Sequence, residues 1–80
     1  MTETELGNKL KEMYETPGEN KTAMIHIFGL IYADEIKNSK VSPAIIAKIA
    51  GISDSYKTEI SKGMALSKYL ELKPEYKNKF

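Results

Sequence analysis

The sequence predicts an all-α fold, a compact domain of four to five helices that contains a helix-turn-helix. Three observations support this class. Apolar residues make up 41% of the 80 residues and charged residues 29%, the balance of a folded domain. Apolar side chains recur at helical spacing, and helix-capping residues divide the chain into segments. Since there is no cysteine, stability must come from packing, and we expect one domain over residues 1–80.

The first helix is expected over residues 3–15. Thr2 and Glu5 have the spacing of a capping box, and the apolar residues that follow recur on one helical face. Pro17 and Gly18 stop this helix, because proline cannot continue the hydrogen-bond ladder and glycine permits a turn.

A second helix is expected over residues 20–38, with Asn20 or Thr22 as its cap. A strand over residues 24–28 is the alternative, but the apolar pattern continues without a turn signal for longer than ten residues, which favours a helix. Apolar side chains cover most of its circumference, so we expect part of it to pack against a second copy of the chain. The residues assigned to this homodimer contact are Ile27, Gly29, Ile31 and Ala33.

A narrow strip of His26, Gly29 and Ala33 interrupts the apolar surface of the second helix. The two small residues equally fit a close helix crossing within one chain and a contact between two chains. His26 is the only histidine and has no partners for catalysis or metal binding, so a packed or partly exposed imidazole is expected.

The third helix is expected over residues 43–50. Ser42 is a strong N-cap, and Pro43 suits the first helical position because its missing N–H would have no partner there. Gly51 can take the left-handed conformation that ends a helix.

A fourth helix is expected over residues 54–62, after a short turn. Ser53 caps its start, and Gly63 ends it. Two short helices joined by so short a turn must cross steeply. Together they form a helix-turn-helix over residues 43–63.

This motif resembles the recognition half of the helix-turn-helix in the Cro and lambda-repressor (XRE-like) class of bacterial and phage regulators. The resemblance rests on Ala47, Gly51, Ile52, Ser53 to Tyr56, Ile60 and Gly63. It implies a repressor-like transcription regulator whose second helix enters the major groove of double-stranded DNA. The chain departs from the family's pattern at Lys57, where an aliphatic residue is usual, and by the intervening helix over residues 20–38.

Charge is unevenly distributed along the chain. Residues 1–36 carry three lysines and seven acids, a balance of −4, whereas residues 37–80 carry nine lysines and four acids, a balance of +5. The basic half coincides with the helix-turn-helix, which indicates a weak phosphate-binding face. All twelve basic residues are lysine, so any base readout must use Lys, Ser, Thr, Asn or Tyr.

The proposed DNA-contacting face lies opposite Tyr56 and Ile60, which are placed inward. Its small polar residues would reach base edges, and its lysines would contact phosphates. The candidate residues are Lys40, Lys48, Ser53, Asp54, Ser55, Lys57, Thr58, Ser61 and Lys62. Asp54 and Glu59 oppose this role, because a carboxylate repels phosphate unless it accepts from a cytosine amino group or pairs with a lysine.

A short fifth helix is expected over residues 65–72. In it, Leu66, Tyr69 and Leu70 have helical spacing and are expected to close the core. Pro74 ends this helix, and the tail after it is expected to be loosely held unless its aromatic residues dock on a partner.

The sequence gives no support for an enzyme, a cofactor, a metal or a small-molecule substrate. It has no paired carboxylates with an enclosed pocket, no glycine-rich phosphate loop and no metal cluster. The longest apolar run, residues 23–33, is too short to span a bilayer, so we expect no membrane contact and a cytoplasmic location. The alternative to DNA binding is a protein-protein interaction module on the same scaffold.

Overall fold

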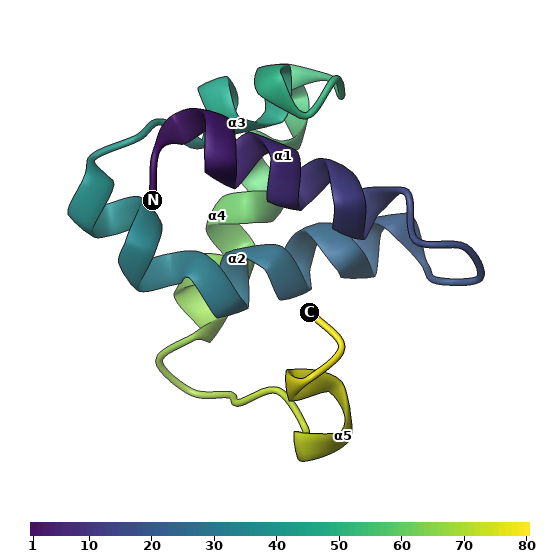
Figure 1. Ribbon diagram of the computed structural model, residues 1–80. Coiled ribbons are helices and arrows are strands. Elements are labelled where there is room, and N and C mark those ends of the chain that lie inside the picture. Colours follow the sequence, from purple (N-terminus) through teal and green to yellow (C-terminus); the bar gives the residue numbers. More distant parts are fainter.

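The computed structural model describes residues 1–80, and every regular element in it is a helix, so the all-α class is confirmed (Figure 1). The elements are α1 (Glu3–Tyr14), α2 (Lys21–Ser39), α3 (Pro43–Ile49), the 3-10 turn η1 (Asp54–Tyr56), α4 (Lys57–Leu66) and α5 (Pro74–Lys77). In Figure 1, α1 and α2 lie in front of α4, α3 lies above them, and α5 lies beneath α2.

Helix α1 begins at the capping box that the sequence predicts. The Thr2 hydroxyl accepts from the N–H of Glu5 at 3.1 Å, and the Glu5 carboxylate accepts from the N–H of Thr2 at 2.9 Å. The bond from the Thr2 backbone lowers the pKa of Glu5, because it stabilises the charged carboxylate. One face of the helix, with Leu6, Leu10 and Met13, is buried in the core.

Helix α2 includes residues 24–28, so the strand alternative for these residues is wrong. Asn20 is its cap, and its side chain accepts from the N–H of Ala23 at 2.8 Å. Tyr32 departs from helical geometry, with φ −102° and ψ 16°, and marks a kink. Lys40 follows the last turn with φ +56°, a left-handed conformation that glycine usually adopts.

One hydrophobic core lies between the first four helices. Phe28 of α2 is the largest fully buried side chain, and Ile60 of α4 and Ile46 of α3 meet the same core. The core residues are Leu6, Leu10, Met13, Met24, Ile25, Phe28, Ile36, Ile46, Ala47, Ala50 and Ile60. Each of the helices α1 to α4 therefore contributes buried apolar side chains to this core.

The predicted helix over residues 65–72 is absent. Helix α4 continues to Leu66, and a turn follows in which the N–H groups of Tyr69 and Leu70 both donate to the carbonyl of Leu66 at 2.9 Å. Pro74 begins α5 instead of ending a helix, because proline suits a first helical position. The apolar residues of this segment do not close the core, since Tyr69 is 79% exposed and Leu70 53%.

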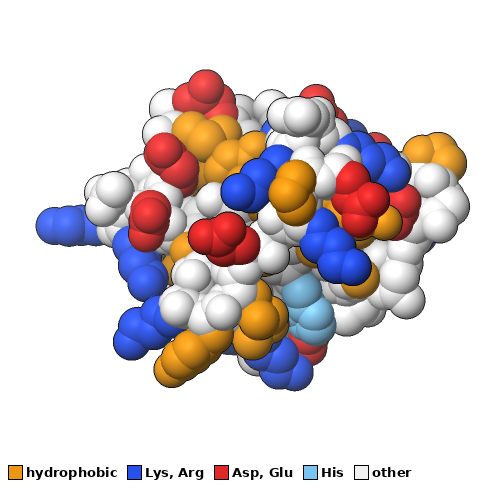
Figure 2. All heavy atoms as spheres, turned by 90° about the horizontal axis from the view of Figure 1, so that it is seen from below, with side chains coloured by type: hydrophobic (Ala, Val, Ile, Leu, Met, Phe, Trp, Pro, Cys, Tyr) orange, Lys and Arg blue, Asp and Glu red, His pale blue; other side chains and the backbone are white.

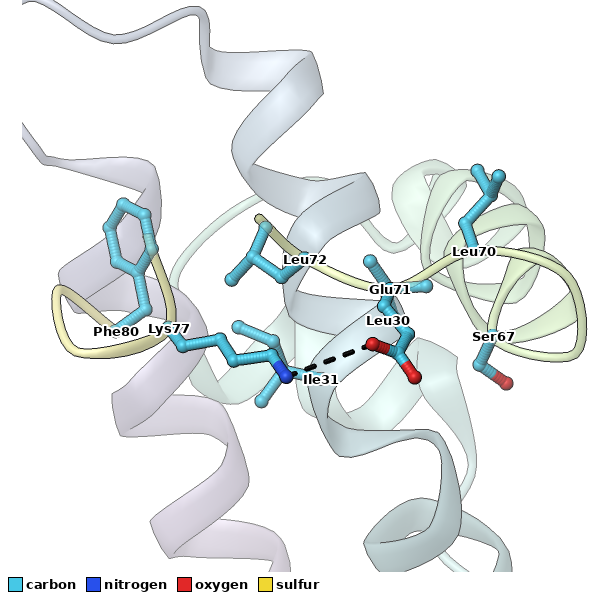
Figure 3. A pocket seen from close by; sticks show the side chains of 8 residues that line it. All are labelled: Leu30, Ile31, Ser67, Leu70, Glu71, Leu72, Lys77 and Phe80. Carbon is cyan, nitrogen blue, oxygen red and sulfur yellow. Dashed lines mark ion pairs between the residues drawn. The ribbon is translucent and has the colours of Figure 1, made fainter. Parts of the chain in front are cut away.

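Residues 67–80, which we call the C-terminal arm, lie against α2. Figure 3 shows Leu30, Ile31 and Leu72 in the middle of a groove, with Phe80 on one side and Leu70 and Ser67 on the other. Phe80 packs against the core, and Lys79 pairs with Glu19 at 3.0 Å. The arm thus covers apolar surface of its own chain, and the expectation that the tail is loosely held stays a prediction.

Candidate nucleic-acid interface

The turn between α3 and α4 has the geometry that the sequence predicts. The N–H of Gly51 donates to the carbonyl of Lys48 at 3.0 Å, and the N–H of Ile52 donates to the carbonyl of Ala47 at 3.1 Å. This pair of bonds is the Schellman motif of a helix C-terminus. Gly51 has φ +81°, which a residue with a side chain rarely adopts. The turn therefore depends on Gly51 itself.

The second helix of the motif begins with one 3-10 turn. The Ser53 hydroxyl accepts from the N–H of Ser55 at 3.2 Å, which caps η1 as expected. The α-helical part starts at Lys57 and ends at Leu66, whereas the sequence predicts a single helix over residues 54–62. The predicted start is confirmed, and the predicted end is too early.

Tyr56 and Ile60 point inward, as the sequence predicts. Ile60 is fully buried, and the Tyr56 ring lies 6.2 Å from the Tyr14 ring of α1, centroid to centroid. The hydrogen-bonding Tyr14 side chain raises the pKa of Tyr56 above its ordinary value. These two side chains fix the opposite face of η1 and α4 toward solvent.

Gly63 does not end α4 because it lies where α4 crosses α2. A Cβ atom on Gly63 would overlap the backbone of His26, and one on Gly29 would overlap the carbonyl oxygen of Ile60. Two helices can approach this closely only where neither has a side chain between them. The strip of small residues on α2 therefore serves a crossing within one chain.

This crossing corrects the assignment of Gly29 and Ala33 to a dimer contact. Gly29 is buried against α4, and Ala33 is only 2% exposed in a single chain. Sequence pattern could not separate the two possibilities, since a small-residue strip has the same spacing whichever chain supplies the second helix. Ile27 and Ile31 remain partly exposed.

Glu59 faces α2 rather than the solvent-exposed side of α4. Its carboxylate lies 2.8 Å from His26 Nε2 and 3.0 Å from Lys62 Nζ, and its side chain is only 20% exposed. The hydrogen bond to His26, followed by that to Lys62, lowers the pKa of Glu59. His26 is partly exposed, as expected, and its ring is visible in Figure 2. Glu59 and Lys62 thus neutralise each other.

The nine candidate DNA contacts all lie at the surface of the chain. Thr58 and Ser61 follow each other along the exposed side of α4, and Ala65 continues this row of small side chains. Lys48 lies on the exposed side of α3. Asp54 is exposed without an ion-pair partner, so one acid does remain on this face.

The family model of the HTH-like domain matches residues 2–73 of the chain. The chain belongs to the HTH-like domain family. The match spans α1 to α4, so the helix between α1 and the helix-turn-helix belongs to the matched region. It supports a helix-turn-helix in general and not the Cro and lambda-repressor class in particular. Comparisons with curated proteins and with solved structures find no match.

A groove of about 460 Å³ borders the exposed side of α4 in this HTH-like domain, and we call it the α4 groove. Three elements meet there: the last turn of α2, the start of α3, and α4 with the turn that follows it. The lining residues are Lys37, Pro43, Ser61, Met64, Ala65, Lys68 and Tyr69. Only Ser61 among them is a residue that the sequence identifies as a candidate contact.

Sequence reasoning misses Lys37, Lys68 and Tyr69 as site residues. The predicted helix over residues 65–72 places Tyr69 in the core and separates Lys68 from α4. The available signal was charge, because both lysines belong to the basic half of the chain.

The HTH-like domain offers no metal centre and no membrane span. Its His, Asp and Glu side chains form no group of three that could hold a metal ion. None of its helices combines the length and the apolar character needed to cross a bilayer.

Proposed function

We propose that this HTH-like domain binds double-stranded DNA, with the exposed face of η1 and α4 in the major groove, and that it acts as a transcription regulator. The main observation that supports this proposal is the kind of side chain on that face. It presents small polar side chains, Ser55, Thr58 and Ser61, on a helix held from behind by buried Ile60. Small side chains allow a helix to approach base edges closely.

The electrostatics of the basic half supports the same proposal. Glu59 is turned toward His26 and paired, so it does not oppose phosphate from the exposed face. Lysines without an ion-pair partner remain free to neutralise phosphates. In residues 37–80 they are Lys37, Lys40, Lys48, Lys57, Lys68 and Lys73.

Selection from a random duplex pool at low salt, followed by titration at rising salt, tests this function. We expect enrichment of a preferred sequence and an affinity that falls steeply with salt. Thr58→Glu should weaken binding about ten-fold or more, because it puts a carboxylate against the duplex. Thr4→Glu makes the same change at an exposed residue of α1, away from this face, and should leave the affinity for DNA unchanged. No binding to any duplex at low salt overturns the proposal.

A protein partner is the second candidate, and the exposed apolar side chains after α4 favour it. Leu66 is 41% exposed, and Tyr69 and Leu70 are more exposed still. Exposed apolar clusters of this kind are typical of protein contacts. This function predicts that the protein binds no duplex and that Thr58→Glu leaves the partner's affinity unchanged.

We also propose that two copies associate through Ile27 and Ile31 of α2. Both side chains are partly buried in the single chain and border grooves beside the C-terminal arm. A second copy would therefore have to take the place of the arm. Association of this type would give a twofold arrangement suited to two DNA half-sites.

A further inference from the structure

We infer that the α4 groove holds one sugar-phosphate strand of the bound duplex, with Lys37 and Lys68 as its phosphate contacts. This inference rests on the proposed DNA binding and adds the place of the backbone. Lys37 comes from the last turn of α2, and Lys68 follows α4, so two separate elements bring positive charge to one groove.

Charge distinguishes the α4 groove from the other grooves of the molecule. Its lining contains two lysines and no acid, and neither lysine has an ion-pair partner. Each of the other three grooves includes at least one glutamate among its lining residues. The charged side chains of the lining sum to +2 in the α4 groove and to +1, 0 and −1 in the others, so an anionic strand is attracted most strongly to the α4 groove.

The position of the groove fits a strand of duplex rather than an isolated anion. A helix in the major groove of B-DNA has a phosphate backbone along each side. Ser61 lies both on the exposed side of α4 and in the lining of the groove, so the two surfaces are continuous. The backbone beside α4 therefore passes over Lys37 and Lys68.

The remaining lining residues suit a nucleic-acid strand. Met64 and Ala65 give the floor apolar surface that a deoxyribose can contact. Tyr69 stands at the rim with 79% of its surface exposed, and its hydroxyl can donate to a phosphate oxygen. An acidic peptide would be drawn to the same lysines, but it would not require the groove to continue onto the exposed side of α4.

The test compares Lys37→Gln and Lys68→Gln with the wild-type protein on the selected duplex. The logarithm of the association constant is measured against the logarithm of salt concentration. Each variant should reduce the magnitude of the slope by about 0.9, and the double variant by about twice that, because each lysine accounts for one phosphate. The preferred sequence should stay the same, since phosphate contacts carry no base information.

Lys11→Gln is the matched control, because Lys11 is an exposed, unpaired lysine on α1 that does not line the α4 groove. It should keep the wild-type slope. If Lys37→Gln and Lys68→Gln also keep that slope while Thr58→Glu weakens binding, the inference is overturned and the DNA-binding function stands. If the wild-type protein binds no duplex, both the inference and the proposed DNA-binding function are overturned. Binding of a polyglutamate peptide that both variants abolish would then assign the groove to acidic peptides.

Discussion

Glu59 is the residue whose side chain most changes the character of α4. From sequence it is an acid beside the proposed DNA-binding face, and in the structure it pairs with His26 and Lys62. The interaction with His26 joins α4 to α2 next to the glycine crossing. From sequence Glu59 is expected to repel phosphate, whereas in the structure it holds α4 against α2.

Glu59→Gln should reduce stability at neutral pH. It should also reduce the loss of stability that the protein shows on acidification. The folded-state pKa of Glu59 lies below its ordinary value of 4.5, so its contribution to stability is present above that value. The contribution is lost as pH falls through the lowered pKa. The difference in unfolding free energy between wild type and variant, measured by urea denaturation, should therefore narrow below about pH 4.5.

Glu15→Gln provides the comparison for this pH series, because Glu15 is an exposed acid without an ion-pair partner. The unfolding free energy of Glu15→Gln should differ little from that of the wild type at every pH. A Glu59→Gln difference that stays constant from pH 7 to pH 3 would show that the carboxylate pairing does not contribute to stability.

At the scale of elements, the crossing of α2 and α4 explains why α4 does not end at Gly63. Glycine normally weakens a helix, and from sequence Gly63 is a stop signal. In the structure it is buried within α4, because the backbone of α2 occupies the space of a side chain. The element's length is therefore set by tertiary packing.

Gly63→Ala distinguishes helix propensity from the close crossing, because the two change the stability of the protein in opposite directions. Helix propensity alone would make the variant more stable by about 1 kcal/mol. Overlap with the backbone of His26 should instead destabilise it by about 2 kcal/mol or more, because the two helices must move apart. Urea denaturation measures the difference, and a more stable variant would contradict the close crossing.

Ser61→Ala is the control on the exposed side of the same helix. Ser61 is exposed and makes no side-chain hydrogen bond to the rest of α4 or to α2. The change should alter stability by less than about 0.5 kcal/mol, with any gain reflecting helix propensity.

Local signals predicted the elements that local bonds define. The capping box at Thr2, the Asn20 cap and the Gly51 turn are all formed within a few residues of each other in the chain. Features that depend on a distant partner could not be predicted in this way. Gly63 needs α2, and the arm's Phe80 needs the core.

The candidate interface shows the same division. The sequence identifies the exposed side of η1 and α4, because Tyr56 and Ile60 define the inward side by helical spacing. It does not identify Lys37, which is brought to the α4 groove from another helix. Lys62, which the sequence predicts as a phosphate contact, has its ammonium group paired with Glu59, and its contact with phosphate stays a prediction.

At the scale of the whole molecule, a second copy bound through α2 as proposed would compete with the C-terminal arm for the same apolar surface. The arm lies over the region of Leu30 and Ile31 (Figure 3). Phe80 packs against the core, and Lys79 pairs with Glu19. Self-association would therefore depend on how readily the arm leaves this surface.

Phe80→Asp should raise the dimer fraction, because it removes the apolar anchor of the arm and exposes α2. Sedimentation velocity over a range of concentrations measures this fraction. Adding Ile31→Glu to the same chain should restore the monomer, since it places a charge in the proposed contact.

Asn78→Asp adds the same negative charge to an exposed position of the arm and should leave the mass distribution of the wild type unchanged. Equal masses for Phe80→Asp and wild type at every concentration would show that the arm does not compete with a second copy.

Under the proposed DNA binding, the glycine crossing also has a consequence for which partner would change shape. With backbone against backbone at Gly29 and Gly63, α4 cannot roll or slide over α2 without opening the core. A duplex bound as proposed would therefore have to bend or twist to match a rigid helix. Base steps that deform easily, such as TA and CA, would then be preferred even at positions that no side chain touches.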